Sequence, residues 1–321
     1  MALSLASFRQ SILGIPLEET TFARRGFCAG TSSVQQRLEK IGRVFVQGYH
    51  AALDENDIET LAQRLNTIEQ DFRGFAFEGA AMGLALLDHL TPWKKNRLPL
   101  FLVGPGTAHT YMVHVGVGWA LARIPWLRRN VEKSSAHLDP LLRWLAIDGY
   151  GFHEGYFHWH KYIKGEPHPL RLKGYARRAF DQGLGRSLWF VDGADVKRIP
   201  ITIAGFPEQR RADLWSGVGL ACTYAGGVEP AEMESLKLSA QIYHSNLAQG
   251  AAFAAKARQR AGNETAHADR ACRIFCGVTA TEAAQVADID MRDLSDDEES
   301  PAYEIWRQRI QSHFASDVAL A

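Results

Sequence analysis

The richest cluster of chemistry-bearing side chains lies between Asp148 and His160, in the run Asp-Gly-Tyr-Gly-Phe-His-Glu-Gly-Tyr-Phe-His-Trp-His. On a helix, Glu154 and His158 are one turn apart, so both side chains could reach the same cation, and His153 lies on an adjoining face. One helix therefore offers only two good ligands. Further ligands would come from neighbouring helices, where the sequence offers three candidates: Glu78, His109 and His114.

Three interpretations of this run stay open. His153, Glu154 and His158 could hold a metal ion, or these three residues and Glu78 could act in acid–base catalysis. Alternatively, the aromatic neighbours form core and His158 is only a hydrogen-bonded partner of Glu154. The metalloprotease motif His-Glu-x-x-His is not met, because His158 comes one residue too late. The sequence does not identify a cofactor.

A recurrent glycine indicates the architecture that must position these residues. Glycines in small-residue helical surroundings occur at positions 48, 79, 116, 155, 183, 217, 250 and 277, with spacings of 31, 37, 39, 28, 34, 33 and 27 residues. These spacings are close to the roughly 34-residue length of a tetratricopeptide-like helix pair. Glycine inside a helix costs about 1 kcal/mol relative to alanine, so its repeated use indicates close approach of neighbouring helices. With 28 glycines in the chain, chance spacing is the alternative.

The residues that precede these glycines would occupy equivalent places in successive repeats. They are Gln47, Glu78, Val115, Glu154, Gln182, Ser216, Gln249 and Cys276. Most are polar, and a buried polar group without a partner costs about 1–3 kcal/mol. They are therefore expected either to line a groove that takes a ligand or to bind one another between helices. The first alternative assigns ligand binding to Gln47, Gln182, Ser216 and Gln249.

The periodicity of apolar residues predicts a mainly all-α fold, a tetratricopeptide-like helical-repeat solenoid of about eight helix-pair units. The expected parts are an N-terminal extension packed on the domain (1–32), the helical-repeat domain (33–287), and an acidic loop with a C-terminal helix (288–321). Helices are expected, among others, at 138–146, 152–163 and 231–261. Loops are expected at 92–105, 124–136, 164–169 and 197–207. Within the last loop, residues 200–204 could pair as a short strand, a possible minor β element.

Charge and hydropathy exclude several classes of function. Lysine plus arginine and aspartate plus glutamate each number 36, so no net field favours nucleic acid. No stretch approaches the roughly 18–20 apolar residues of a membrane span, and the best candidate, Val113–Ala122, is expected to be a buried helix. The four cysteines are expected to pack as hydrophobes in a reducing compartment, which favours a cytoplasmic location. They are Cys28, Cys222, Cys272 and Cys276.

Several runs of the sequence resemble one family. They are Leu13-Gly-Ile-Pro, Gly74-Phe-Ala-Phe-Glu-Gly-Ala, Gly151-Phe-His-Glu-Gly-Tyr-Phe, Phe180-Asp-Gln-Gly-Leu-Gly-Arg-Ser and Asp213-Leu-Trp-Ser-Gly-Val-Gly-Leu-Ala-Cys-Thr-Tyr-Ala-Gly-Gly. Over nearly the whole chain, the sequence resembles a bacterial domain of unknown function that is associated with enediyne biosynthesis gene clusters. The resemblance implies a role in natural-product biosynthesis, handling a polyunsaturated, polyketide-derived chain alongside companion proteins. It carries over no catalytic residues.

Three hypotheses of function follow. In the first, the protein is a biosynthetic accessory protein or enzyme whose groove binds an apolar, unsaturated intermediate, with polar groups from Glu78, His153, Glu154 and His158. In the second, a solenoid holds partner biosynthetic proteins on its concave face. In the third, the histidine cluster makes the protein a metalloenzyme.

Overall fold

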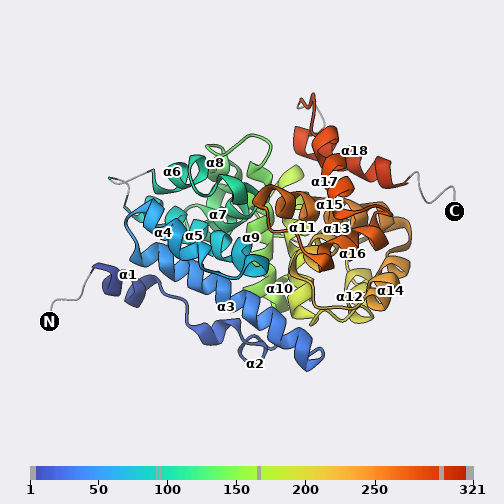
Figure 1. Ribbon diagram of the computed structural model, residues 1–321, viewed down its shortest axis with the longest axis horizontal. Coiled ribbons are helices and arrows are strands. Elements are labelled where there is room, and N and C mark those ends of the chain that lie inside the picture. Colours follow the sequence, from blue (N-terminus) through green and yellow to red (C-terminus); the bar gives the residue numbers. More distant parts are fainter. Residues whose placement is uncertain (1–4, 92, 94–95, 165–167, 296–299, 316–321) are drawn as a thin grey trace.

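The computed structural model describes residues 5–91, 93, 96–164, 168–295 and 300–315 of the chain (Figure 1). Every regular element among these residues is a helix, and no strand occurs in this part of the chain. The prediction of an all-α fold is therefore confirmed. None of the described helices combines the length and the apolar character needed to cross a membrane.

Long helices pack side by side in chain order and form the centre of the molecule. They are α3 (Ser32–Asp54), α5 (Gln70–Leu90), α7 (Thr110–Arg123), α9 (Arg143–Phe157), α11 (Tyr175–Val191), α13 (Glu208–Ala225), α15 (His244–Ala261) and α17 (Ala280–Asp290), and each contacts the next. Shorter helices connect them: α4 (Ile58–Asn66), α6 (Arg97–Val103), α8 (Val131–Ser135), α10 (Trp159–Tyr162), α12 (Arg198–Ala204), α14 (Pro230–Ala240) and α16 (Ala266–Phe275). The flanking helices are α1 (Leu5–Leu13), η1 (Leu17–Thr20), α2 (Phe22–Arg25) and α18 (Ala302–Ala315).

Glycines allow these helices to cross at backbone contact. A side chain on Gly183 of α11 would collide with the carbonyl group of Asp148 on α9, and one on Gly217 of α13 would collide with that of Gln182. In each case the glycine meets the residue that precedes the corresponding glycine of the previous long helix. A second glycine two positions later faces the following helix, as Gly185 faces Leu214. Glycine is required because any Cβ atom would force the two backbones apart.

These contacts correct the repeat register predicted from the sequence. The residues whose carbonyl groups meet a glycine of the next long helix are Phe45, Glu78, Val115, Asp148, Gln182 and Ser216, and Gln249 precedes the equivalent glycine of α15. Their spacings by subtraction are 33, 37, 33, 34, 34 and 33 residues, which is more regular than the predicted series. In α9 the repeat position is therefore Asp148, where the sequence had suggested Glu154. Gln47 and Cys276 also lie outside this set.

Gly155 and Gly277 differ from the repeat glycines. Gly155 still packs closely, but against the Ser187 side chain of α11. Gly277 follows α16 with a φ of 75°, and no neighbouring atom lies within 4 Å of a built Cβ. That position needs glycine for its left-handed backbone, with no helix crossing involved. The close-packing role predicted for Gly277 is wrong.

Several predicted boundaries are also wrong, for local reasons. The break expected between 146 and 152 does not exist, because α9 runs unbroken through the two crossing glycines. The helix expected over 231–261 is divided at Gln241, whose φ is 48°. Residues 200–204 belong to α12, where Pro200 lies in the first turn that tolerates proline, so no strand forms there. The expected loops at 92–105 and 124–136 contain α6 and α8.

The row of long helices curls until its early and late members contact each other. Arg258 of α15 donates to Asp71 of α5 at 3.1 Å and to the carbonyl oxygen of Tyr224 at 2.5 Å. Arg37 of α3 donates to the same Asp71 at 2.8 Å and to the carbonyl oxygen of Ala225 at 2.6 Å. In an open solenoid each repeat contacts only its neighbours, so these contacts depart from that arrangement.

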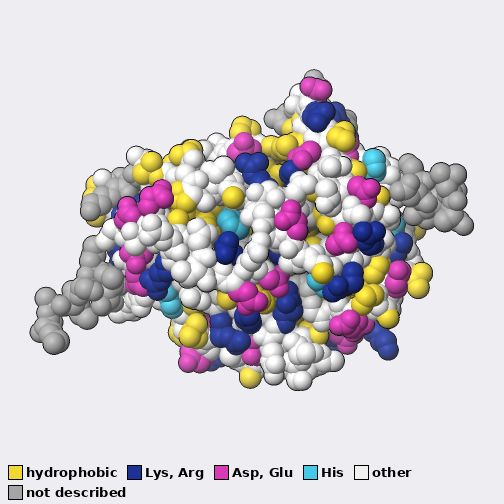
Figure 2. Space-filling view, in the orientation of Figure 1, with side chains coloured by type: hydrophobic (Ala, Val, Ile, Leu, Met, Phe, Trp, Pro, Cys, Tyr) yellow, Lys and Arg dark blue, Asp and Glu magenta, His cyan; other side chains and the backbone are white. Residues whose placement is uncertain are grey.

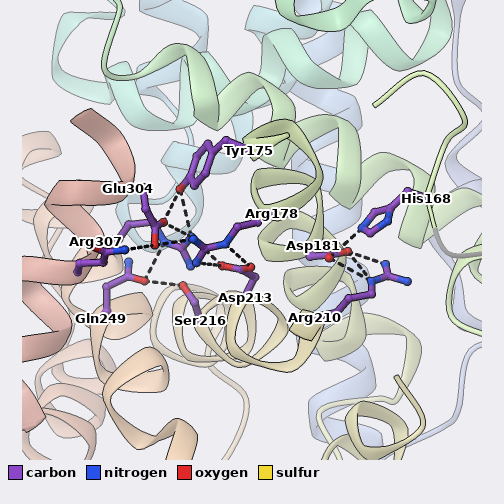
Figure 3. A network of polar contacts seen from close by, with 11 residues as sticks. His168, Tyr175, Arg178, Asp181, Arg210, Asp213, Ser216, Gln249, Glu304 and Arg307 are labelled. Carbon is purple, nitrogen blue, oxygen red and sulfur yellow. Dashed lines mark hydrogen bonds and ion pairs between the residues drawn. The ribbon is translucent and has the colours of Figure 1, made fainter. Parts of the chain in front are cut away.

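A buried polar network holds α18 against the long helices (Figure 3). The fully buried Arg307 donates to Asp213 at 2.8 Å, to Glu304 at 3.1 Å and to Gln249 at 3.2 Å. Arg178 of α11 bonds both Asp213 and Glu304. Each of these charged groups loses its hydration on burial. Removal of one group therefore leaves an uncompensated buried charge, which destabilises the fold.

Acidic and basic side chains alternate over the face of the molecule shown in Figure 2, with no large area of one sign. This distribution agrees with the equal numbers of basic and acidic residues in the sequence. The charges of this face therefore create no extended electrostatic field for a polyanion or a polycation.

The crossing contacts predict that a single added methyl group greatly lowers the free energy of unfolding. Replacing Gly183→Ala should lower the free energy of unfolding by about 1–3 kcal/mol or more, because the added Cβ meets the backbone of α9. Chemical denaturation measures this change. The control is Gly205→Ala on the exposed end of α12, where a Cβ would lie 3.3 Å from its nearest neighbour and the cost should stay under about 1 kcal/mol. Equal losses in the two variants would contradict the crossing argument.

The network around α18 predicts a second contrast. Replacing Arg307→Met should cost about 3–5 kcal/mol of stability, because two buried carboxylates lose one of the two arginines that neutralise them. Arg273→Met removes an exposed ion pair with Asp269 in α16 and should cost no more than about 1 kcal/mol. Urea unfolding followed by circular dichroism compares the two, and a cost for Arg307→Met no larger than the control's would show that the network does not stabilise the fold.

Candidate functional site

An aromatic cavity lies between the long helices of the N-terminal half. Helices α3, α5, α7, α9 and α11 all contribute to its walls, and its volume is about 40 Å³. Its aromatic lining residues are Phe45, Phe75, Trp119, Phe152, Tyr156, Phe157 and Phe190. The lining is almost entirely apolar, so a polar group of a bound ligand would find few hydrogen-bond partners inside the cavity.

Glu78 brings an ionisable group into this cavity. Its side chain is buried on α5, beside the crossing glycine Gly79, and Oε1 accepts a hydrogen bond from Nε1 of Trp119 at 3.0 Å. The other oxygen, Oε2, has no hydrogen-bond partner among the described residues. Burial raises the pKa of Glu78 to about 7, although the Arg186 charge and the Trp119 hydrogen bond oppose the increase. Near neutral pH this carboxyl group can both give and take a proton.

An outer pocket of about 440 Å³ adjoins the aromatic cavity. Both spaces are lined by Ile15, Glu19 and Phe157, which form the boundary between them. The outer pocket also carries the basic side chains of Arg123 and Arg128. A ligand with an apolar end and a polar end could therefore occupy both spaces at once.

The outer pocket also contains His153 and His158, which with Glu154 form the cluster that the sequence singled out. Nδ1 of His153 lies 3.1 Å from Oε1 of Glu154, and Nδ1 of His158 lies 3.3 Å from Oε2. Burial lowers the pKa of His153 in spite of the adjacent carboxylate. For Glu154, burial acts to raise the pKa, but hydrogen bonds from the two histidines outweigh it and lower the pKa to about 2. Glu154 is therefore ionised at neutral pH.

Trp119 of α7 connects the cavity to the histidine cluster. Its indole N–H bonds Glu78, and its ring packs edge-on against His153 with 5.5 Å between the ring centres. Its ring also contacts those of Phe45 and Phe152, with 4.5 and 5.1 Å between the ring centres. The structure thus brings Glu78 and His153 into contact with the same indole. Trp119 was missed by the sequence analysis, because nothing along the chain links it to Glu78.

The other predicted ligand-binding residues lie elsewhere. Gln47 is exposed on α3 and lines a separate surface pocket. Gln182 is buried and donates to Asp148 at 2.9 Å and to the Tyr303 hydroxyl at 3.1 Å. Ser216 donates to Gln249 at 2.7 Å. Each of these three buried residues therefore bonds another helix, as in the second alternative for the repeat positions, although Oε1 of Gln182 and Nε2 of Gln249 have no hydrogen-bond partner among the described residues.

Asp148 and Arg186 form a buried ion pair that the sequence analysis did not identify. Arg186 of α11 bonds Asp148 of α9, and both side chains are almost completely buried. The signal was present in Asp148-Gly-Tyr-Gly151, which has the same form as Gln182-Gly-Leu-Gly185. Aligning these two runs gives the register that the structure shows and places a carboxylate opposite the Gln182 amide.

The histidines proposed as additional ligands do not reach the cluster. His109 stacks on Phe77 with 4.1 Å between ring centres, and burial lowers its pKa to about 4. His114 Nδ1 lies 2.8 Å from the carbonyl oxygen of Thr110.

Burial raises the pKa of the Cys222 thiol, which makes that side chain an inert hydrophobe.

The fold and cavity define an all-α protein with a buried carboxyl group, that of Glu78, in an aromatic cavity. The chain belongs to the family described as "Protein of unknown function (DUF1702)", whose model matches residues 4–314. The match covers the aromatic cavity and the histidine cluster. No curated protein and no solved structure matches the chain.

The position of Glu78 predicts a pH-dependent cost. Because burial raises its pKa from 4.5 to about 7, the folded protein should lose stability as the pH rises from about 4.5 to 7, and the loss should be complete above 7. Glu78→Gln lacks this cost, so its stability relative to the original protein should increase by about 3 kcal/mol across that range. Denaturation at a series of pH values tests this. Glu264→Gln, at an exposed position, is the control, and parallel curves for Glu78→Gln would exclude the raised pKa.

Proposed function

We propose that the protein binds an apolar, unsaturated intermediate of natural-product biosynthesis, with the apolar end in the aromatic cavity and Glu78 exchanging a proton with it. The observation that carries the proposal is the free Oε2 atom of Glu78, which is buried among aromatic rings. An apolar cavity with very few polar points is the usual design of a small-molecule site.

The aromatic walls favour a flat, conjugated chain. Trp119 and Phe152 meet edge-to-face, and Phe152 and Phe190 are tilted at 42°, so ring faces and ring edges both border the cavity. Such rings contact a planar π-system over a larger area than a branched saturated chain. The inner cavity is narrow, so it accommodates the end of such a chain, while the outer pocket takes the remainder.

Glu78 can act as a general acid and base on this chain. Trp119 fixes Oε1 and leaves Oε2 as the atom that exchanges the proton. Donation from Oε2 to one carbon of a conjugated system, followed by removal of a proton from another carbon, would move a double bond and restore the carboxylic acid. Atoms and charges balance over these two steps, and no further reactant is required.

The biosynthetic setting rests on the runs of sequence that resemble the enediyne-associated family, among them Gly74 to Ala80, which contains Glu78. A polyunsaturated chain from that type of pathway matches the apolar character of the cavity. The alternative role as a scaffold for partner proteins has less support, because the contacts of Arg258 and Arg37 bring early and late helices together, unlike the open solenoid whose concave face a scaffold uses.

Binding of a fluorescent conjugated fatty acid, cis-parinaric acid, tests the proposal. Its fluorescence should rise saturably on addition of the protein. Gly42 of α3 and Thr20 of η1 both line the aromatic cavity, and a Cβ on Gly42 would lie 2.9 Å from Thr20, so Gly42→Phe crowds this wall and should weaken binding by about tenfold or more, or roughly 1.4 kcal/mol. Gln47→Phe, at an exposed position on the same helix, should leave the affinity within about twofold. Absence of saturable binding, or equal affinities of these two variants, would refute the aromatic cavity as the binding site.

A further inference from the structure

We infer that His153, Glu154 and His158 form a binding site for one divalent transition-metal ion, Zn²⁺ or Fe²⁺, with an open coordination position toward the outer pocket. One ligand atom from each of the three residues lies within 4.8 Å of the others. Two imidazoles and a carboxylate are the donor set that both metals accept. This inference does not depend on the ligand proposed for the aromatic cavity.

The end of α9 creates the geometry. The helix stops at Phe157, and His158 leaves the helical conformation with φ −126° and ψ 35°, while its amide still donates to the carbonyl oxygen of Glu154 at 2.8 Å. This bend keeps the His158 ring beside the Glu154 carboxylate, one turn back along the chain. His153 lies within α9 on a face next to that of Glu154. The Glu154 carboxylate nevertheless reaches the rings of both His153 and His158.

The distances suit a bound ion. Ligand atoms at about 2.0 Å from a tetrahedral metal are separated by about 3.3 Å. Nδ1 of His153 lies 3.1 Å from Oε1 of Glu154, and Nδ1 of His158 lies 3.3 Å from Oε2, so each nitrogen has a carboxylate oxygen at about this separation. One ligand atom from each residue lies within 4.8 Å of the others, so rotation of the side chains has to bring the three atoms together around one ion, and the two nitrogens release any proton shared with the carboxylate.

The surroundings leave room for a further ligand. Glu154 is almost fully buried, whereas the His158 side chain is 48% exposed and borders the outer pocket. Three protein ligands with one position open to a pocket are the pattern of catalytic metal sites, while structural sites are closed by four. Arg123 and Arg128 line the same pocket and could hold an anionic group on the open side.

Metal binding to the full-length protein tests the inference. Purified protein is analysed for its elements, stripped with a chelator, and titrated separately with Zn²⁺ and, without oxygen, Fe²⁺. We expect one equivalent of metal to bind, and elemental analysis shows which of the two the protein retains. In cobalt-loaded protein, visible absorption should report nitrogen and oxygen ligands.

Matched variants separate coordination from simple hydrogen bonding. His158→Ala should weaken binding by more than the roughly 10- to 100-fold that loss of a group orienting a ligand costs. Glu154→Gln keeps the size of the side chain and most of its hydrogen bonds, and it should also lose the metal. His160→Ala is the control, because His160 is exposed nearby and stacks on Trp159. Failure of the original protein to bind either ion, or unchanged binding in His158→Ala, would overturn the inference. Neither outcome affects the polyene measurement, which needs no metal.

Discussion

Contact between helix backbones is the constraint on which the rest of this structure depends. At each crossing from α3 to α15 a glycine lies against a carbonyl group of the preceding long helix, and there is no space for even a methyl group. The residue before each glycine is consequently held next to a crossing and away from water. In α5, α9, α11, α13 and α15 these residues are polar and buried: Glu78, Asp148, Gln182, Ser216 and Gln249. Close packing thus commits the protein to a polar interior whose members need partners.

Most of this polar interior is matched between helices. Asp148 pairs with Arg186, and Gln182 bonds Asp148 and Tyr303. Gln249 joins Ser216 to Arg307, so the network extends to α18. These contacts need groups from elements far apart in the sequence, and they form only when the register of the crossings is correct. They therefore make the packing of the helices specific, beyond what apolar contacts alone require.

The sequence was sufficient for features that depend on local order, and insufficient for those that depend on register. Apolar periodicity predicted the helices, and the cluster of His153, Glu154 and His158 was recognisable because its members lie within one and a half turns. The register of α9 was misassigned because His-Glu-Gly at 153–155 resembles Phe-Glu-Gly at 77–79, whereas packing uses Gly149 and Gly151. The aromatic cavity was not predictable, since its rings come from five helices and converge only after the helices pack.

Glu78 differs from the other polar repeat positions because it lines the aromatic cavity. Asp148 occupies an equivalent repeat position and bonds an arginine, while Glu78 bonds only the neutral indole of Trp119 and leaves one oxygen unpaired. A leucine there would avoid the cost of burying a carboxyl group, so stability gives no reason for a glutamate. Buried groups with a strongly shifted pKa are concentrated at functional sites, and this one faces a cavity. The same indole packs against His153. A ligand that moves Trp119 would therefore change the surroundings of both Glu78 and the histidine cluster.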